Sequence, residues 1–297
     1  MEEYSFKSCY ITANQHLSRV KNGGSHRLSA KEMMKMKWKF MHNIHSAMLW
    51  LSILILPIAA GDGAGWYCVR NREHRQPTLG GDLTWVEEYD GYYIDHAHGD
   101  SADEKVLYLT FDAGYENGNV AKILDILRNR EVPGAFFVLE HLISCHPELI
   151  LRMRDEGHTV CNHTARHPDM TTMPTEAEFA AELRALEEAY TALTGDAMPK
   201  YYRPPEGRFN RANMEWAEAL GYKTIFWSFA YADWDNSRQP DPAEAKARIL
   251  DNIHNGAVIL LHPTSAANAA ILGEVIDTLK ADGWRFGTLD ELTAAAG

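Results

Sequence analysis

Short apolar runs alternate with amphipathic segments along the last two thirds of the chain. An apolar run at 106–111 has the length of a buried strand, and the segment 119–130 repeats its apolar positions with a helical period. The pattern predicts further strands at 134–138, 159–162, 200–203, 224–228, 257–261 and 285–288, separated by helices at 147–156, 175–193, 211–220, 242–253 and 269–280. Such alternation is typical of parallel strands joined by crossover helices, and it predicts an α/β sheet or barrel.

The predicted domain covers residues 105–297. Gly157, Gly221 and Gly283 each follow a helical segment, as C-terminal helix stops do. There is no internal repeat, and an α/β barrel of roughly 200 to 250 residues commonly forms one domain. The preceding segment 61–104 is rich in charged, glycine and aromatic residues without sustained periodicity, so we expect an irregular arm there.

The amino-terminal region has the order of an export signal. Lys35, Lys37 and Lys39 precede an apolar run at 47–60 that ends in small residues. This run is shorter than the roughly 20 residues that span a bilayer and suits a signal-peptide core, although the apolar residues that follow could extend it into an anchor. We therefore expect residues 1–60 to be a signal peptide or membrane anchor and the protein to be exported. A buried helix is the alternative interpretation.

Composition narrows the class of partner. Hydrophobic residues make up 45% and charged residues 24% of the chain, as in an ordinary globular protein. The formal net charge of -12 argues against nucleic acid as the main partner, because phosphate backbones are bound by clustered Lys and Arg. A neutral or sugar-like substrate fits this charge better. The four cysteines lack the density and spacing of a disulfide scaffold or a CxxC site.

Four predicted strands are each followed by residues that can carry chemistry. Asp112 ends the first run, His163 and His167 follow the strand at 159–162, and Arg203 and His262 end two later strands. The carboxyl ends of parallel strands converge on one face, where active sites of such folds lie. Each residue alone has an ordinary explanation: a turn carboxylate, a pair of surface histidines or a core histidine.

Taken together, the clusters resemble the motifs of the polysaccharide deacetylases, also called the NodB-homology or carbohydrate esterase 4 family. The similarity extends over about 105–292, in five segments at 110–114, 163–167, 203–207, 233–234 and 260–262. Local strings such as 114–118 (Gly-Tyr-Glu-Asn-Gly) are most similar to the muramic acid de-N-acetylases of delta-lactam synthesis. The resemblance implies a distorted (β/α) barrel of the NodB-homology type and a single catalytic domain.

The resemblance also implies an acid–base mechanism for amide hydrolysis. Asp112 would be the general base, with Arg203 orienting it and lowering its pKa. His262 would protonate the departing amine, and Asp233 would pair with His262 and favour its protonated form.

A divalent metal, expected to be zinc, would be held by His163 and His167 according to the same resemblance. One residue departs from the family pattern, because Ala113 stands where a second aspartate usually coordinates the metal. Two histidines alone bind a divalent ion more weakly than two histidines and a carboxylate. The candidates to replace the missing ligand are Asp112, Glu116 and Asn117.

The expected substrate is a cell-wall glycan. The resemblance implies that the backbone N–H of Glu206 completes an oxyanion site. We expect Tyr115, Phe209 and Trp234 to contact the sugar; the alternative, which is open for Tyr231 as well, is that these rings pack the core. The implied function is removal of N-acetyl groups from peptidoglycan, at muramic acid residues on the way to the muramic delta-lactam of spore cortex. The alternatives are a deacetylase of N-acetylglucosamine or chitin-type polymers, and a catalytically inactive glycan-binding barrel. We expect a monomer, bound to the membrane through its amino-terminal apolar segment.

Overall fold

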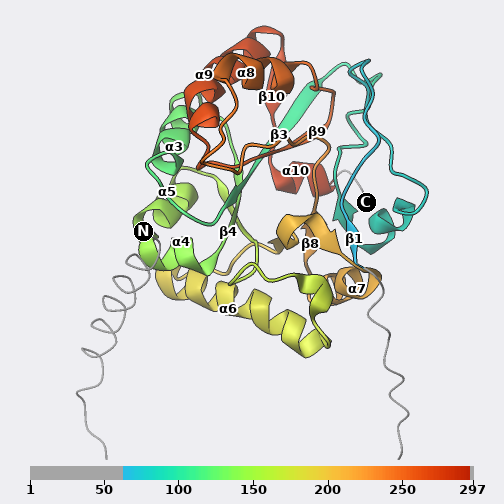
Figure 1. Cartoon of the computed structure of the whole chain (residues 1–297), viewed down its shortest axis with the longest axis vertical. Helices are drawn as coiled ribbons and strands as arrows, with labels where there is room; N and C mark the ends of the chain where they lie inside the picture. Colours follow the sequence, from blue (N-terminus) through green and yellow to red (C-terminus); the bar gives the residue numbers. More distant parts are fainter. Residues whose placement is uncertain (1–62, 295–297) are drawn as a thin grey trace, which may run out of the picture. The chain divides into compact units, whose positions relative to one another are not determined.

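A curled parallel sheet forms the centre of the computed structural model, which describes residues 63–294 (Figure 1). The sheet order is β10-β3-β4-β5-β6-β8-β2, where β2 is Gly91–Tyr92 in the arm, and β9 pairs with β3. The strands that follow the arm are β3 (Lys105–Ala113), β4 (Ala135–Val138), β5 (Thr159–Asn162), β6 (Tyr201–Tyr202), β8 (Lys223–Ile225), β9 (Ala257–Leu261) and β10 (Trp284–Phe286). A parallel bridge joins Phe229, beyond the end of β8, to Ile259 of β9. Because β9 also lies on β3, this bridge brings the two sides of the sheet together into a distorted barrel.

Helices cover the outside of the curled sheet. In Figure 1, α8 and α9 lie at the top, α3 and α5 on one side and α6 along the bottom. Their bounds, with the shorter helices, are α3 (Val120–Asn129), α4 (Glu140–Cys145), α5 (Pro147–Asp155), α6 (Glu176–Thr194), α7 (Arg211–Ala219), α8 (Pro242–Leu250), α9 (Ala266–Ala281) and α10 (Leu289–Ala294). Single 3-10 turns occur at η2 (Met170–Thr172) and η3 (Pro205–Gly207), the latter followed by the short strand β7 (Arg208–Phe209).

The sequence pattern explains these elements. All five residues of β9 are buried, as expected of a parallel strand that is covered on both faces. Helix α3 buries Val120, Ile123, Leu124 and Leu127, an i, i+3, i+4, i+7 stripe that faces the core. The predicted α/β barrel is therefore confirmed, and each predicted strand and helix is present with bounds shifted by a few residues. The short helices α4 and α10 were not predicted, because neither is long enough to show a full period.

The segment before the barrel is only partly irregular. It contains β1 (Ala64–Gly65), η1 (Thr84–Tyr89) and β2 (Gly91–Tyr92). Strand β2 adds to the main sheet in parallel with β8, and β1 pairs antiparallel with β7. The indole of Trp66 stacks on Phe226, with ring centroids 4.1 Å apart. Two-residue strands leave no alternation in a sequence, so the pattern predicted an irregular arm although this segment belongs to the sheet.

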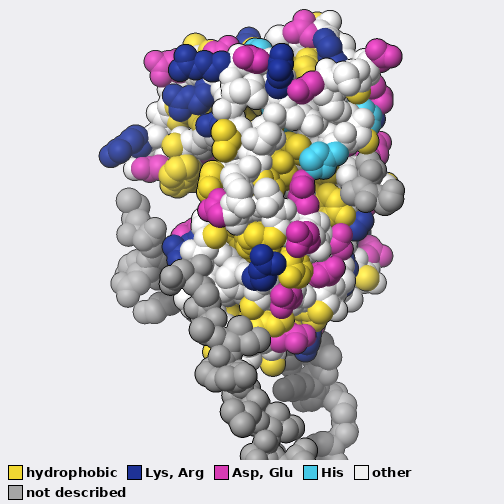
Figure 2. Space-filling model, turned by 90° about the vertical axis from the view of Figure 1, so that its right-hand side faces the viewer, with side chains coloured by type: hydrophobic (Ala, Val, Ile, Leu, Met, Phe, Trp, Pro, Cys, Tyr) yellow, Lys and Arg dark blue, Asp and Glu magenta, His cyan; other side chains and the backbone are white. Residues whose placement is uncertain are grey.

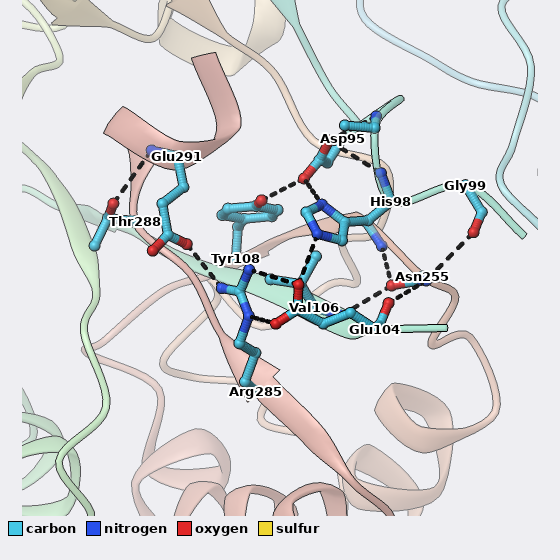
Figure 3. A network of polar contacts seen from close by, with 12 residues as sticks. Asp95, His98, Gly99, Glu104, Val106, Tyr108, Asn255, Arg285, Thr288 and Glu291 are labelled. Carbon is cyan, nitrogen blue, oxygen red and sulfur yellow. Dashed lines mark hydrogen bonds and ion pairs between the residues drawn. The ribbon is translucent and has the colours of Figure 1, made fainter. Parts of the chain in front are cut away.

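A polar network joins the arm to the strands and to α10 (Figure 3). The buried carboxylate of Asp95 accepts a hydrogen bond from the Tyr108 hydroxyl and contacts His98 Nδ1 at 2.6 Å. His98 Nε2 lies 3.0 Å from Glu104, which forms an ion pair with Arg285. Because His98 lies between two carboxylates, its pKa is raised, although burial opposes the shift. The network fixes the arm on the barrel.

The predicted signal or anchor lies outside the described residues. Across positions 63–294, no helix has the length and apolar character needed to cross a bilayer. On the face shown in Figure 2, acidic side chains predominate over Lys and Arg in the lower part, where they surround apolar patches.

Candidate active site

The predicted chemical residues lie together at the carboxyl ends of the strands. Asp112 is the penultimate residue of β3, and His163 directly follows β5. Arg203 directly follows β6, and His262 directly follows β9. Contacts among Asp112, His163 and Arg203 bring three of these strands to one site. His262 lies near enough to Asp112 for each group to shift the pKa of the other.

Arg203 holds Asp112 in place. Its Nη1 donates to Asp112 Oδ1 at 2.9 Å, and its Nη2 donates to Thr110 Oγ1 at 2.9 Å. Its Nε donates to the backbone carbonyl of Ile225, and its Nη2 also donates to that of Phe226. The guanidinium, which is fully buried, also stacks over Phe137 with Cζ 4.1 Å from the ring centre. Hydrogen bonds from all three guanidinium nitrogens leave this planar group one orientation, so they also fix the position of the Asp112 carboxylate.

The environment keeps Asp112 ionised. Burial alone would raise the pKa of this carboxyl, but the neighbouring His163, Arg203 and His262 outweigh it and lower the pKa below 3.8. The carboxylate is 11% exposed, so solvent or substrate can reach it. An ionised, reachable carboxylate is a suitable proton acceptor.

His163 is held as a neutral imidazole. Its Nδ1 donates to the carbonyl of Arg203 at 2.8 Å, which leaves Nε2 without a proton and 3.5 Å from Asp112 Oδ2. Burial lowers the pKa of His163 to about 4. A neutral ring whose Nδ1–H is fixed by a carbonyl is the form in which histidine binds metals.

His167 lies beside His163 on a strained loop. The ring centroids are 5.0 Å apart and the rings are inclined by 71°. The loop places Thr164 and His167 at φ angles of 73° and 60°. Positive φ is unfavourable for a β-branched residue such as Thr164, and strain of this kind is common at functional sites. The side chain of His167 is exposed, so it can bind a ligand from solvent.

The donor set fits a divalent ion in part. Ala113 is fully buried and offers no ligand, and residues 63–294 contain no group of three or more His, Cys, Asp or Glu arranged to hold a metal. The substitutes considered from the sequence do not complete such a group: Glu116 Oε1 accepts the N–H of Gly118, and the Asn117 amide donates to Thr264 O at 2.8 Å. The two imidazoles are therefore the donors that fit.

His262 and Asp233 form the second half of the site. His262 Nδ1 donates to Asp233 Oδ1 at 2.7 Å, and the His262 backbone N–H donates to Asp233 Oδ2 at 2.8 Å. Burial lowers the pKa of His262, but Asp233 and the more distant Asp112 outweigh it, so the pKa is raised above 6.5. The imidazole is 25% exposed and its Nε2 is the ring nitrogen that does not face Asp233. This arrangement suits a proton donor.

The predicted substrate contacts have different outcomes. Tyr115 and Trp234 are 58% and 60% exposed, and the Trp234 ring lies 6.3 Å from His262. Glu206 has a φ of 56°, in the left-handed region, and its side chain is exposed. Phe209 is different: it is 1% exposed and packs against Trp66, Trp85 and Phe226. Its prediction as a sugar contact is wrong, because its ring fills the core between the arm and the barrel.

Sequence reasoning did not assign some residues that support the site. Thr110 accepts a hydrogen bond from Arg203, and its place inside a strand two residues before Asp112 was the available signal, since both side chains point to the same face. Asn268 donates to Asp233 Oδ2 at 2.6 Å. Tyr231, which the sequence left open between sugar stacking and packing, is buried and donates to Asn268 Oδ1.

Comparisons with known proteins agree with this geometry. Residues 99–225 match the family model described as "Polysaccharide deacetylase". Together with a relative that is 39% identical and covered over 84% of its length, this shows that the chain belongs to the polysaccharide deacetylase family, a class of hydrolases.

That relative is the peptidoglycan-N-acetylmuramic acid deacetylase PdaA of Bacillus subtilis, and the match covers 76% of this chain. The solved structure of B. subtilis PdaA, a family 4 carbohydrate esterase, superposes with a TM-score of 0.74 and 37% identity, covering 80% of this chain and 99% of that chain. A peptidoglycan-N-acetylglucosamine deacetylase of Bacillus cereus is 30% identical, with 71% of this chain and 74% of the relative covered.

Proposed function

We propose that this protein is a peptidoglycan deacetylase that removes the N-acetyl group from muramic acid residues. The observation that carries the proposal is the pair of oppositely tuned groups at the strand ends: Asp112 with a lowered pKa and His262 with a raised pKa. Two titratable groups pushed toward opposite protonation states indicate a base and an acid. The muramic acid assignment is supported by similarity to PdaA over most of the chain.

Amide hydrolysis uses both groups in turn. Asp112 accepts a proton from the water that attacks the acetyl carbonyl, and Arg203 keeps the carboxylate ionised and oriented. His262 gives its Nε2 proton to the nitrogen of the departing sugar amine, and Asp233 stabilises the imidazolium beforehand. The carbon–nitrogen bond breaks as that nitrogen gains its proton. Acetate and the free amine leave.

His163 and His167 would hold a divalent ion, which we propose is zinc. When bound, the ion supplies Lewis acidity toward the acetyl oxygen and lowers the pKa of water. His163 is prepared for this role by the hydrogen bond from its Nδ1 to the Arg203 carbonyl, which leaves Nε2 as the ligand atom.

The exposed surface around these groups would bind the glycan. Tyr115 and Trp234 present exposed rings on which a sugar can lie. The left-handed conformation of Glu206 orients its backbone N–H, which would donate to the developing oxyanion. The protein would act outside the cytoplasm as a monomer, exported or anchored by residues 1–60, and its product would enter the muramic delta-lactam of spore cortex.

Acetate release from defined glycans tests the substrate. The full-length chain is incubated with peptide-stripped peptidoglycan and, separately, with chitooligosaccharides. We expect acetate from the stripped peptidoglycan and little from the chitooligosaccharides. Release from the chitooligosaccharides alone would establish an N-acetylglucosamine deacetylase instead. Glycan binding without acetate from either substrate would establish an inactive glycan-binding barrel.

A metal test accompanies this assay. We expect a chelator to remove activity and zinc to restore it. The double variant His163→Ala, His167→Ala is expected to bind zinc about 100-fold more weakly in equilibrium dialysis, because both imidazole donors are lost. His146→Ala, a histidine paired with Glu148 on α5, is the matched control and keeps normal zinc binding. Unchanged zinc binding by the double variant would place the ion elsewhere.

A further inference from the structure

The buried side chain of Asn268 contacts the acid half of the site without reaching the position of a substrate. Asn268 lies in the first turn of α9 and is fully buried. Its Nδ2 donates to Asp233 Oδ2 at 2.6 Å and to the His262 carbonyl at 3.1 Å. One amide group therefore contacts both members of the pair that would protonate the leaving amine.

Every polar atom of this amide has a partner that fixes its orientation. The Tyr231 hydroxyl donates to Asn268 Oδ1, and Asn268 Nδ2 faces a carboxylate, which can only accept. If the amide turned over, its oxygen would face the Asp233 carboxylate and its NH2 group would face a hydroxyl that now donates. Asn268 is thus locked as a donor to Asp233.

The donor acts on one particular oxygen of Asp233. Oδ2 accepts from Asn268 and from the His262 backbone N–H, whereas Oδ1 accepts from His262 Nδ1 at 2.7 Å. Two donors on Oδ2 resist rotation of the carboxylate about its Cβ–Cγ bond, which leaves Oδ1 directed at the imidazole.

Two further side chains hold the loop that carries Asp233 on the start of α9. The Ser265 hydroxyl accepts the Asn268 backbone N–H at 3.1 Å and donates to Gln239 Oε1 at 2.6 Å. Gln239 Nε2 donates in turn to the carbonyl of Asp233 at 3.0 Å. The Asp233 backbone and carboxylate are therefore both held by groups attached to α9.

We propose that Asn268 is a positioning residue that, supported by Tyr231, keeps the Asp233 carboxylate directed at His262 and so keeps His262 protonated for the reaction. The kinetic consequence of this proposal rests on the proposed function, whereas its effect on the geometry of His262 and Asp233 does not depend on that function. The charged groups that face His262 are Asp233, Asp112 and Arg203. Asn268 contacts only the first of these three, so a substitution at 268 leaves the Asp112–Arg203 pair in place.

The test measures the pKa of His262 by NMR in the full-length chain, with the resonance assigned by its loss in His262→Gln. In Asn268→Leu, a substitution of similar size, we expect the pKa to fall by roughly half a unit to one unit, because the carboxylate turns away from the ring. If the Asp233 carboxylate stayed in place, the loss of one donor would make it a better hydrogen-bond acceptor for His262, and the pKa of His262 would rise instead. A raised or unchanged pKa overturns the proposal.

Tyr231→Phe provides a second and milder variant. It removes only the hydroxyl that holds the Asn268 amide, and we expect a smaller fall of the His262 pKa in the same direction. This variant keeps the proposal testable if Asn268→Leu does not fold. Asn213→Leu is the matched control, because Asn213 is equally buried but its amide donates to Met170 O, away from His262. We expect the control to leave the His262 pKa unchanged.

Kinetics provide the second measurement. On the glycan that the wild type deacetylates, Asn268→Leu is expected to lower kcat roughly tenfold to a hundredfold with little change in KM, and to move the alkaline limb of the pH profile downward. An increase in KM alone would mean that Asn268 affects substrate binding rather than proton transfer, which overturns the proposal. If the wild type releases no acetate, the proposed function fails while the NMR result still decides the role of Asn268.

Discussion

The two halves of the site are built in opposite ways. In the Asp112 half, the cation Arg203 is fully buried and the carboxylate is 11% exposed. In the His262 half, the carboxylate of Asp233 is buried and the imidazole is 25% exposed. In each pair the buried member fixes the exposed one and stabilises its charged form. In the proposed function the exposed member meets the substrate, and the buried partners have opposite charges because Asp112 would act deprotonated and His262 protonated.

The largest effects on activity are expected when the exposed member of each pair, Asp112 or His262, is replaced. Asp112→Asn and His262→Gln are expected to lower kcat about a thousandfold or more, because each removes a proton-transfer group while keeping a similar shape. Acetate release is the measurement, and thermal unfolding controls for the fold. Substantial activity in either variant would show that its pair does not carry the proton transfer.

Removing a buried member is expected to damage the fold as well as the chemistry. Arg203→Met leaves Asp112 and the carbonyls of Ile225 and Phe226 without their donor. The expected loss is about 3 to 5 kcal/mol of unfolding free energy in urea titration. The matched variant Arg285→Met removes two solvent-accessible ion pairs, with Glu104 and Glu291, and should cost about 1 kcal/mol. Equal losses of unfolding free energy in the two variants would contradict the inference that the burial of Arg203 makes its removal costly.

The pH profile separates the two halves. Activity that requires protonated His262 is expected to fall as pH rises through a pKa above 6.5, and Asp233→Asn should move this limb down and reduce kcat roughly tenfold. The stability of the pair follows the same sign: it is fully present below pH 6.5 and is lost as pH rises through the raised folded pKa. If the alkaline limb of the pH–activity profile does not move in Asp233→Asn, a group other than His262 produces that limb.

The smallest expected effect concerns the aromatic residues predicted to contact the sugar. Trp234→Ala should raise KM about two- to tenfold with kcat nearly unchanged, because an exposed ring near His262 is lost. Phe209→Leu should leave KM unchanged and cost about 1 kcal/mol of stability, since its ring is buried in the core. Steady-state kinetics on a soluble glycan distinguish them. A raised KM in Phe209→Leu would show that Phe209 contacts the sugar after all, contrary to its burial.

The same contrast explains how much of the site the sequence could predict. Asp112, His163, Arg203 and His262 directly end or follow regular strands, and parallel strands deliver such residues to one edge. Phe209 was misplaced because a composition pattern does not say which side of a short strand faces a core built from the distant arm. The hydrogen bonds among Asp233, Asn268 and Gln239 join a long loop to a helix start, and nothing local in the sequence indicates that pairing.

The docking of the arm on the barrel limits when the arm can fold during protein synthesis. Trp66 donates its indole N–H to the carbonyl of Trp227, a residue 161 positions later. At roughly 5 to 20 residues per second, about 8 to 30 seconds of synthesis separate the two partners. During that interval Trp66 lacks the aromatic residues on which it packs, so the arm can dock only after β8 and the residues that follow it have been synthesised.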